Sequence, residues 1–192
     1  MPPLRAPGGE IEAYFMILDR LFRPRAAQEA GRALYAAAVA EARQPRLYAE
    51  LGAPDTPEGR FELYTLHVLL LIERLRGQGP AAAETSQALF DTYISALDHG
   101  LRELGVGDTS VGKKMRRLGE AFYGRGKSYD AAIAALPDRT PLVAFLGRTT
   151  FADATAGRPE ALAEELLAKR DALAAQDLAG LLSGTVSWEA RA

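Results

Sequence analysis

The sequence predicts an all-α fold, a single globular helical domain of about seven to nine helices. Alanine and leucine dominate the 192 residues, while β-branched residues, which favour strands, are sparse. Apolar residues recur at spacings of three and four along most of the chain, and no convincing pair of strands is present. With 48% hydrophobic and 25% charged residues, the chain can bury a core and is not expected to be disordered.

We expect the chain to consist of four parts. Residues 1–9, rich in proline and glycine, are expected to form a flexible N-terminus. Residues 10–25 are expected to form an amphipathic helix that ends at the sequence RPR. The helical domain proper then covers residues 26–182, and residues 183–192 form a C-terminal tail with the single tryptophan.

The turn GAPDTPEGR is expected to start the central helix of the domain. Asp55 or Thr56 can cap this helix, and Pro57 suits its first turn. Glu58 stands three residues after Asp55, which is the spacing of a capping box. The helix extends to about Arg76 and is apolar on nearly every side, so we expect it to lie in the core.

The other helices are predicted from apolar residues at helical spacing and from the prolines and glycines between them. The sequence GRGKS is expected to interrupt one of them, which then resumes at Tyr129. The predicted ranges are 27–43, 81–104, 111–123, 129–136, 141–146 and 160–173.

The stretch GDTSVGKK, residues 107–114, has the G-x-x-x-x-G-K pattern of a phosphate-binding loop. Such a loop follows a buried strand and carries Ser or Thr after its lysine to hold magnesium. Here Lys114 follows Lys113, and the residues before the stretch have helical spacing. The pattern therefore indicates a junction between two helices and not a nucleotide site.

At this junction we expect glycines to end the first helix and a polar residue to cap the second. Gly105 or Gly107 is expected to adopt the left-handed conformation that often ends a helix. The expected caps of the second helix are Asp108, Thr109 and Ser110. Gly112, in the first turn, is expected to let another backbone come close.

The sequence GKKMRRLGEAFYGRGKSY predicts an amphipathic helix with a basic stripe, in which Glu120 is the single acid. Because the net charge of the whole chain is only −2, positive charge is concentrated in this segment. The stripe is either a solvated face or a docking surface for an acidic partner, RNA phosphates or anionic headgroups. The candidate partner-binding residues are Lys113, Lys114, Arg116, Arg117, Arg125, Lys127, Arg102, Arg60 and Tyr123.

Composition excludes several classes of function. The chain has no cysteine, which excludes disulfides, thiolate nucleophiles and cysteine-based zinc sites. Its small net charge gives no general reason to expect DNA as a partner. The longest apolar run, near residues 63–72, is short of the about 20 residues that span a bilayer. The start MPPLRAPGGEIE has acids where a signal peptide is apolar.

The two histidines do not indicate a metal site. His67 lies in the most apolar helix and is interpreted as a satisfied core residue, because no His/Asp/Glu cluster stands at ligand spacing. His99 neighbours Asp98, with Arg102 and Glu103 one turn on. We expect these four side chains to pair within their helix, although they can also form a polar recognition edge.

No pattern of catalytic residues is present. Arg60, at the start of the central helix, is either an ion-pair partner of Asp55 or a contact residue. We find no convincing Ser/His/Asp order, isolated carboxylate pair or HExxH motif. We therefore expect no catalytic residue, cofactor or metal ion. The alternative is an all-α enzyme whose carboxylates come together from distant helices.

The segment IEAYFMILDRLFRPR is amphipathic, rich in aromatic residues and basic at its end. One interpretation is that it lies in the headgroup region of the inner membrane. The other is that its apolar face packs on the core; the acids Glu10, Glu12 and Asp19 weaken the membrane interpretation. The candidate membrane-interface residues are Tyr14, Phe15, Leu18, Phe22, Arg23 and Arg25.

Two segments resemble the ubiquinol–cytochrome c chaperone family, assembly factors for respiratory complex III. They are LYAAAVAEARQPRLYAELGAPDTPEGRFELYTLHVLLLIERL and LFDTYISALDHGLRELGVGDTSVGKKMRRLGEAFYGRGKSY. The resemblance covers roughly residues 33–136 and is weaker toward residue 182. Within it, DTPEGRFEL and LRELGVGDTSVGKKMRRLGEAFYGR together are fairly specific to the family.

The resemblance implies an all-α fold and a non-enzymatic role. Mitochondrial members of the family are similar to a ribosome-associated chaperone that holds newly made cytochrome b, with a small partner protein, for complex III assembly. The chain lacks a transit peptide and is rich in Ala and Arg, so it looks like a bacterial member. The resemblance supplies no catalytic residues.

From the resemblance we expect an assembly chaperone that binds cytochrome b, newly made or unassembled, and promotes assembly of the ubiquinol–cytochrome c reductase complex. The expected place is the cytoplasm, with peripheral contact at the cytoplasmic face of the inner membrane. A groove between helices is expected to take an apolar segment of the client, lined by aromatic residues. The aromatic candidates are Tyr64, Tyr93, Phe122, Tyr123 and Tyr129. The rival interpretations are an RNA- or ribosome-binding module using the basic helix 113–127, and an all-α enzyme.

Overall fold

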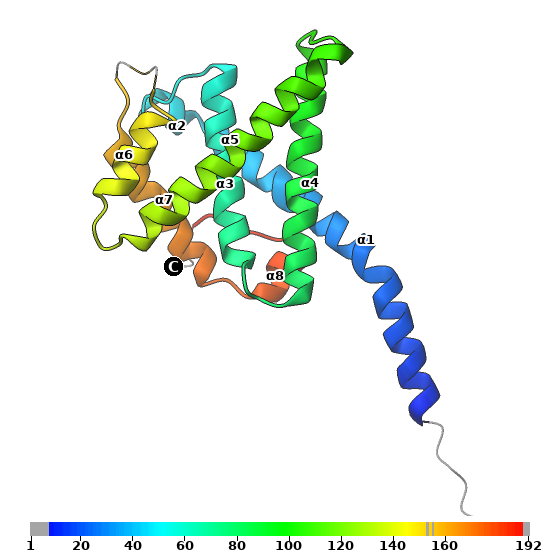
Figure 1. Ribbon diagram of the computed structural model, residues 1–192. Helices are drawn as coiled ribbons and strands as arrows, with labels where there is room; N and C mark the ends of the chain where they lie inside the picture. Colours follow the sequence, from blue (N-terminus) through cyan, green and yellow to red (C-terminus); the bar gives the residue numbers. More distant parts are fainter. Residues whose placement is uncertain (1–7, 153, 155, 190–192) are drawn as a thin grey trace, which may run out of the picture.

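The computed structural model describes the backbone of residues 8–152, 154 and 156–189, and side chains in these ranges from residue 25 onward except at 108 and 109. This part contains eight α-helices and no strand, which confirms the predicted all-α class (Figure 1). The helices are α1 (Gly8–Ala42), α2 (Pro45–Ala49), α3 (Pro57–Leu75), α4 (Pro80–Glu103), α5 (Asp108–Ala134), α6 (Thr140–Arg148), α7 (Pro159–Ala174) and α8 (Leu178–Leu182).

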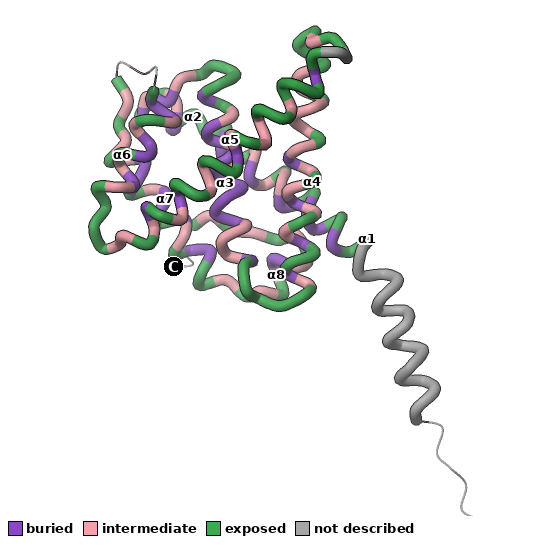
Figure 2. The backbone as a smooth tube through the Cα atoms, viewed as in Figure 1, coloured by how far each residue is buried: buried purple, intermediate pink, exposed green. Residues whose placement is uncertain are grey.

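Helix α3 lies at the centre, as its apolar sequence predicts. It packs against α1, α4, α5 and α7, and most of its side chains are buried on all sides (Figure 2). Thr56 caps it, with its Oγ1 accepting a hydrogen bond of 3.1 Å from the Gly59 N–H. Asp55 is not the cap and forms no capping box with Glu58, because its carboxylate binds Arg60 at 2.6 Å.

Helix α1 is one element where the sequence predicts two. The expected end at the RPR sequence is wrong, because α1 is continuous from Gly8 to Ala42. A proline removes one backbone donor, and that loss does not end a helix whose other residues favour it. Further along, Gly31 brings α1 and α4 into backbone contact, since a Cβ there would lie 2.6 Å from the Ala88 carbonyl carbon.

Helix α5 is likewise continuous through GRGKS, so the predicted interruption is wrong. Each glycine inside a helix costs about 1 kcal/mol relative to alanine. Burial of Phe122 and Tyr129 on either side of GRGKS offsets that cost. Gly126 also lies against α3, where an added Cβ would meet a Leu69 methyl group at 3.4 Å.

The α4–α5 junction is the helix punctuation that the sequence predicts. Gly105 has φ = 78°, and the N–H of Val106 donates to the Leu101 carbonyl at 3.1 Å, which completes a Schellman motif. The cap of α5 differs from the prediction, because Gly107 occupies the N-cap position without a side-chain hydrogen bond. Gly112 has no atom within 4 Å of an added Cβ, so the expected close approach is wrong.

A buried charge network joins α1, α2 and α7. Lys169 is only 7% exposed and pairs with Glu41 of α1 and, at 3.2 Å, with Glu165 of its own helix. Glu165 also pairs with Arg46 of α2. Two acids and two bases thus balance one another where three helices meet.

The C-terminal segment, residues 183–189, packs across α1 and α3. Gly184 has φ = 85° and lies so close to α1 that an added Cβ would be 2.7 Å from the Ala33 methyl. Trp188 contacts His67 of α3 edge-to-face, with ring centroids 5.3 Å apart. The Gln176 side chain holds the segment by exchanging two hydrogen bonds of 2.7 and 2.8 Å with the Ser187 backbone.

Candidate functional site

An aromatic groove lies where the end of α3 and the start of α4 meet α5. Its volume is about 360 Å³. We call it the aromatic groove. It is lined by Ile72, Leu75, Arg76, Gly77, Ala83, Ser86, Gln87, Phe90, Phe122 and Tyr123.

Three aromatic rings form one wall of the groove. The Phe90 ring of α4 contacts two rings of α5, with centroids 5.0 Å from Phe122 and 5.9 Å from Tyr123. Phe122 is buried, whereas Tyr123 is 68% exposed at the mouth. An exposed aromatic ring supported by buried ones is a common anchor for a binding partner.

The floor behind this wall is fixed by Tyr93. Its ring lies 5.3 Å from Phe122, and its hydroxyl shares a hydrogen bond of 2.8 Å with Thr65 of α3. Burial raises the pKa of Tyr93 above its ordinary value, so the hydroxyl stays neutral. The groove therefore rests on a rigid, uncharged base.

Arg125 holds α5 against α3 beside the groove. Its guanidinium binds both carboxylate oxygens of Glu62, with the shortest contact at 2.6 Å. Glu62 is 8% exposed, and its hydrogen bond raises the pKa of Arg125. Arg125 differs from the other described members of the predicted basic stripe in binding a buried carboxylate, so it has a structural role in holding α5 on α3.

We predict that Arg125→Met lowers the free energy of unfolding by about 2 kcal/mol, because the Glu62 carboxylate is then buried without a partner. The estimate is below that of a fully buried pair because the Arg125 side chain is 31% exposed. Urea unfolding followed by circular dichroism measures the effect. The matched control is Arg117→Met on the exposed face of the same helix, and equal midpoints for the two variants would contradict the prediction.

The other predicted basic residues of α5 are exposed. Among the described residues, none of them forms an ion pair with an acid. Glu120 is the single acid among them. We call this surface the α5 cation face. It consists of Lys113, Lys114, Arg116, Arg117 and Lys127.

The remaining predicted contact residues lie apart from that face. Arg60 pairs with Asp55, and Arg102 pairs with Asp98 at 2.8 Å. His99 pairs with Glu103 at 3.2 Å, so the four side chains around it pair within α4 as predicted.

Sequence reasoning found only part of the groove. Of its aromatic candidates, Phe122 and Tyr123 line it, Tyr93 supports it, and the remaining two lie elsewhere. The hydroxyl of Tyr64 accepts from Arg43 at 2.7 Å, and that of Tyr129 donates to Glu73 at 2.6 Å. Phe90 was missed as a groove residue, because its helical spacing with Leu89 and Tyr93 is also typical of a core position.

The family of the protein follows from comparison with known proteins. A model of the ubiquinol–cytochrome C chaperone family matches residues 49–188. The chain belongs to the ubiquinol–cytochrome c chaperone family. The crystal structure of the Cbp3 homolog from Brucella abortus is similar, with a TM-score of 0.78 and 38% sequence identity over 89% of this chain and 95% of that one. No curated protein matches the chain.

Membership of this chaperone family implies that the protein binds a client protein, and it favours binding over catalysis. The aromatic groove is the apolar cavity best suited to that role. In the described residues, no helix is both long and apolar enough to cross a membrane. The same residues contain no group of three or more His, Asp or Glu side chains placed to hold a metal ion.

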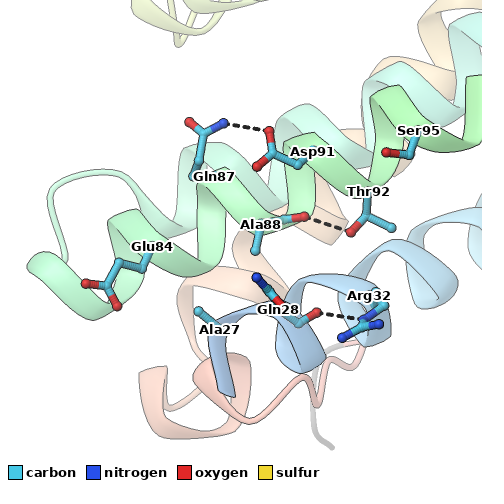
Figure 3. Close-up of a pocket in the computed structure, with 9 residues that line it drawn as sticks. All are labelled: Ala27, Gln28, Arg32, Glu84, Gln87, Ala88, Asp91, Thr92 and Ser95. Carbon is cyan, nitrogen blue, oxygen red and sulfur yellow. Dashed lines mark hydrogen bonds between the residues drawn. The ribbon is translucent and has the colours of Figure 1, made fainter. Parts of the chain in front are cut away.

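A larger cavity, with a volume of about 610 Å³, lies between α1 and α4 (Figure 3). Its polar side chains largely bond within their own helices: Gln87 donates to Asp91 at 2.8 Å, and Arg32 donates to the Gln28 carbonyl at 3.2 Å. Its apolar walls consist of Ala27 and Ala88. Its lining contains no aromatic or large aliphatic side chain that could anchor a client, so we prefer the smaller aromatic groove.

A third cavity, about 420 Å³, contains one carboxylate, that of Glu73. Glu73 is held by Arg170 at 2.8 Å and by the Tyr129 hydroxyl at 2.6 Å. Arg74 donates to two carbonyls at the end of α7. The site therefore lacks the convergent carboxylates that the rival enzyme interpretation needs.

His67 is buried in the core as predicted. Its Nδ1 bonds to the Leu63 carbonyl at 2.8 Å, while its Nε2 has no partner among the described atoms, so it is only half satisfied. Burial lowers its pKa to about 4. The ring is therefore neutral near neutral pH.

The candidate membrane-interface residues of the N-terminal helix are mostly outside the described side chains, namely Tyr14, Phe15, Leu18, Phe22 and Arg23. Arg25 is described and exposed. It pairs with Glu29 one turn on, at 3.4 Å.

Proposed function

We propose that the protein is an assembly chaperone that binds cytochrome b, newly made or unassembled, and promotes assembly of the ubiquinol–cytochrome c reductase complex. The family supports the role, and the aromatic groove is the single observation that supports the binding site. The proposal places the protein in the cytoplasm, at the cytoplasmic face of the inner membrane while it holds its client.

The groove suits an apolar helix or extended segment of the client. Its wall of Phe90, Phe122 and Tyr123 offers hydrophobic area, and its rim carries the polar side chains of Arg76 and Gln87. Arg76 pairs with Asp130 at 3.1 Å, so the rim is held in place. Hydrophobic anchors inside and polar groups at the edge are the usual anatomy of a protein interface.

We predict that Tyr123→Ser weakens binding of cytochrome b, and so lowers its recovery, roughly thirtyfold, because an anchoring aromatic contributes about 2 kcal/mol to binding. The tagged chain is used to capture proteins from detergent-solubilised membranes of its own cell, and mass spectrometry identifies them. The matched control is Leu104→Ser, since Leu104 is 69% exposed and does not line the groove.

A second variant fills the groove without removing a wall residue. Ala83 is exposed and lines the groove, so Ala83→Trp should also lose cytochrome b, whereas Ala131→Trp, at an exposed site outside it, should not. Full recovery with both Tyr123→Ser and Ala83→Trp would move the binding site elsewhere. Absence of cytochrome b from the wild-type capture would overturn the function itself. A ribosome or a small partner protein, the other proposed partners, would be identified in the same capture.

A further inference from the structure

We infer that the α5 cation face docks the protein on an anionic lipid bilayer. The inference concerns docking on a membrane and not binding of a client. Only the relevance of this docking to complex assembly rests on the proposed function. It depends on the arrangement of charge on α5, on two exposed apolar side chains and on the position of the groove.

The cations lie mainly on one side of the helix. With about 100° of rotation per residue, Lys113, Arg116, Arg117 and Lys127 fall within an arc of about 100°, and Lys114 lies beyond its edge. All five are exposed, and Glu120 is the one acid within the arc. A helical face with several unpaired cations attracts the negative surface of an anionic bilayer.

Two exposed apolar side chains distinguish a bilayer from a purely phosphate-bearing partner such as RNA. They are Tyr123, 68% exposed, and Leu104, 69% exposed, the large hydrophobic residues left uncovered in the described part. Helical spacing puts Tyr123 beside Arg116 and Lys127, and tyrosine favours the headgroup region. Leu104 lies at the junction of α4 and α5, a hairpin whose tip projects from the top of the helical body in Figure 1. A leucine at this tip gains nothing from phosphates but is stabilised in the acyl boundary.

Tyr123 connects the aromatic groove with the α5 cation face. It lines the mouth of the aromatic groove and stands next to the α5 cation face. A protein docked through that face therefore holds the mouth of the groove close to the bilayer surface, where an apolar client segment emerges from or enters the lipid.

The test is flotation of the full chain with phosphatidylcholine vesicles, with and without phosphatidylglycerol, and no client present. Wild type should bind only the vesicles that contain phosphatidylglycerol, and binding should fall as salt rises. Changing Lys113, Lys114, Arg116 and Arg117 to Gln should weaken partitioning on the order of several hundredfold, since each of the four charges contributes about a factor of five.

A matched variant removes four exposed arginines elsewhere, namely Arg32, Arg139, Arg148 and Arg158, and should bind almost as wild type does. Equal loss in both variants, or no wild-type binding to phosphatidylglycerol, would overturn the inference. Preferential binding of a ribosomal RNA fragment over these vesicles would overturn it too and assign the face to nucleic acid. Because client capture is measured in detergent, it reports on the proposed function independently of vesicle binding.

Discussion

Lys169→Met is expected to lower the free energy of unfolding by about 3–5 kcal/mol. Lys169 is 7% exposed and neutralises Glu41 and Glu165, which come from different helices. Methionine retains most of the side-chain volume, so the main effect is electrostatic. Without the lysine, Arg46 still pairs with Glu165, but the partly buried Glu41 loses the cation it pairs with in the described structure.

Urea unfolding followed by circular dichroism measures this loss, and Lys127→Met on the exposed face of α5 is the matched control, expected within about 0.5 kcal/mol of wild type. A further variant, Lys169→Met with Glu41→Gln, should regain part of the stability because one unpaired charge is removed. If Lys169→Met unfolds at the same urea concentration as Lys127→Met, the network does not stabilise the fold.

His67 is expected to make the protein less stable as pH falls from about 6.5 to about 4. Burial lowers the pKa of the folded ring from 6.5 to about 4. In this window the unfolded chain binds a proton that the folded chain does not, so the stability present above pH 6.5 is lost toward pH 4. The full loss is about 3 kcal/mol.

Burial is the main reason why protonation of His67 is unfavourable, and the charge network next to the ring does not reverse it. Lys169 disfavours a charged ring, while Glu41 and Glu165, which would favour it, are already balanced by bases. Trp188 covers the ring and keeps water away.

The pH effect is measured by urea unfolding of wild type and His67→Leu at several pH values. The carboxylates titrate in both proteins, so the free energy of unfolding of wild type minus that of His67→Leu isolates the contribution of His67. This difference should fall as pH falls. His99→Leu, at an exposed site, is the control for a histidine-to-leucine change outside the core. Parallel wild-type and His67→Leu curves would contradict the lowered pKa.

The sequence predicts elements best where local and tertiary preferences agree. Helix α3 is apolar on nearly every side and has a cap in Thr56, and its position in the core is confirmed. The α4–α5 junction is confirmed as well, because Gly105 adopts a backbone conformation that few other residues tolerate. Helices α1 and α5 are longer than predicted, because local penalties of about 1–3 kcal/mol at glycine and proline do not decide where a packed helix ends.

The candidate site likewise contains some residues that the sequence predicts and others that only the packing of the helices reveals. The exposed cations of α5 can be found from sequence, because they follow one another on a short amphipathic segment. Arg125 cannot be separated from them, since its partner Glu62 lies 63 residues away and only the packing of α5 on α3 brings them together. The aromatic groove depends on the angle between three helices, which spacing along the chain does not specify.

The C-terminal segment has a consequence for the order of folding. Gly184 packs on α1 near Ala30 and Ala33, so this contact joins residues near opposite ends of the described chain. Closing so long a loop costs entropy that is recovered only after the helices between have formed. We therefore expect the C-terminal segment to fold last and to unfold first. Its amide hydrogens should exchange with solvent sooner than those of α3.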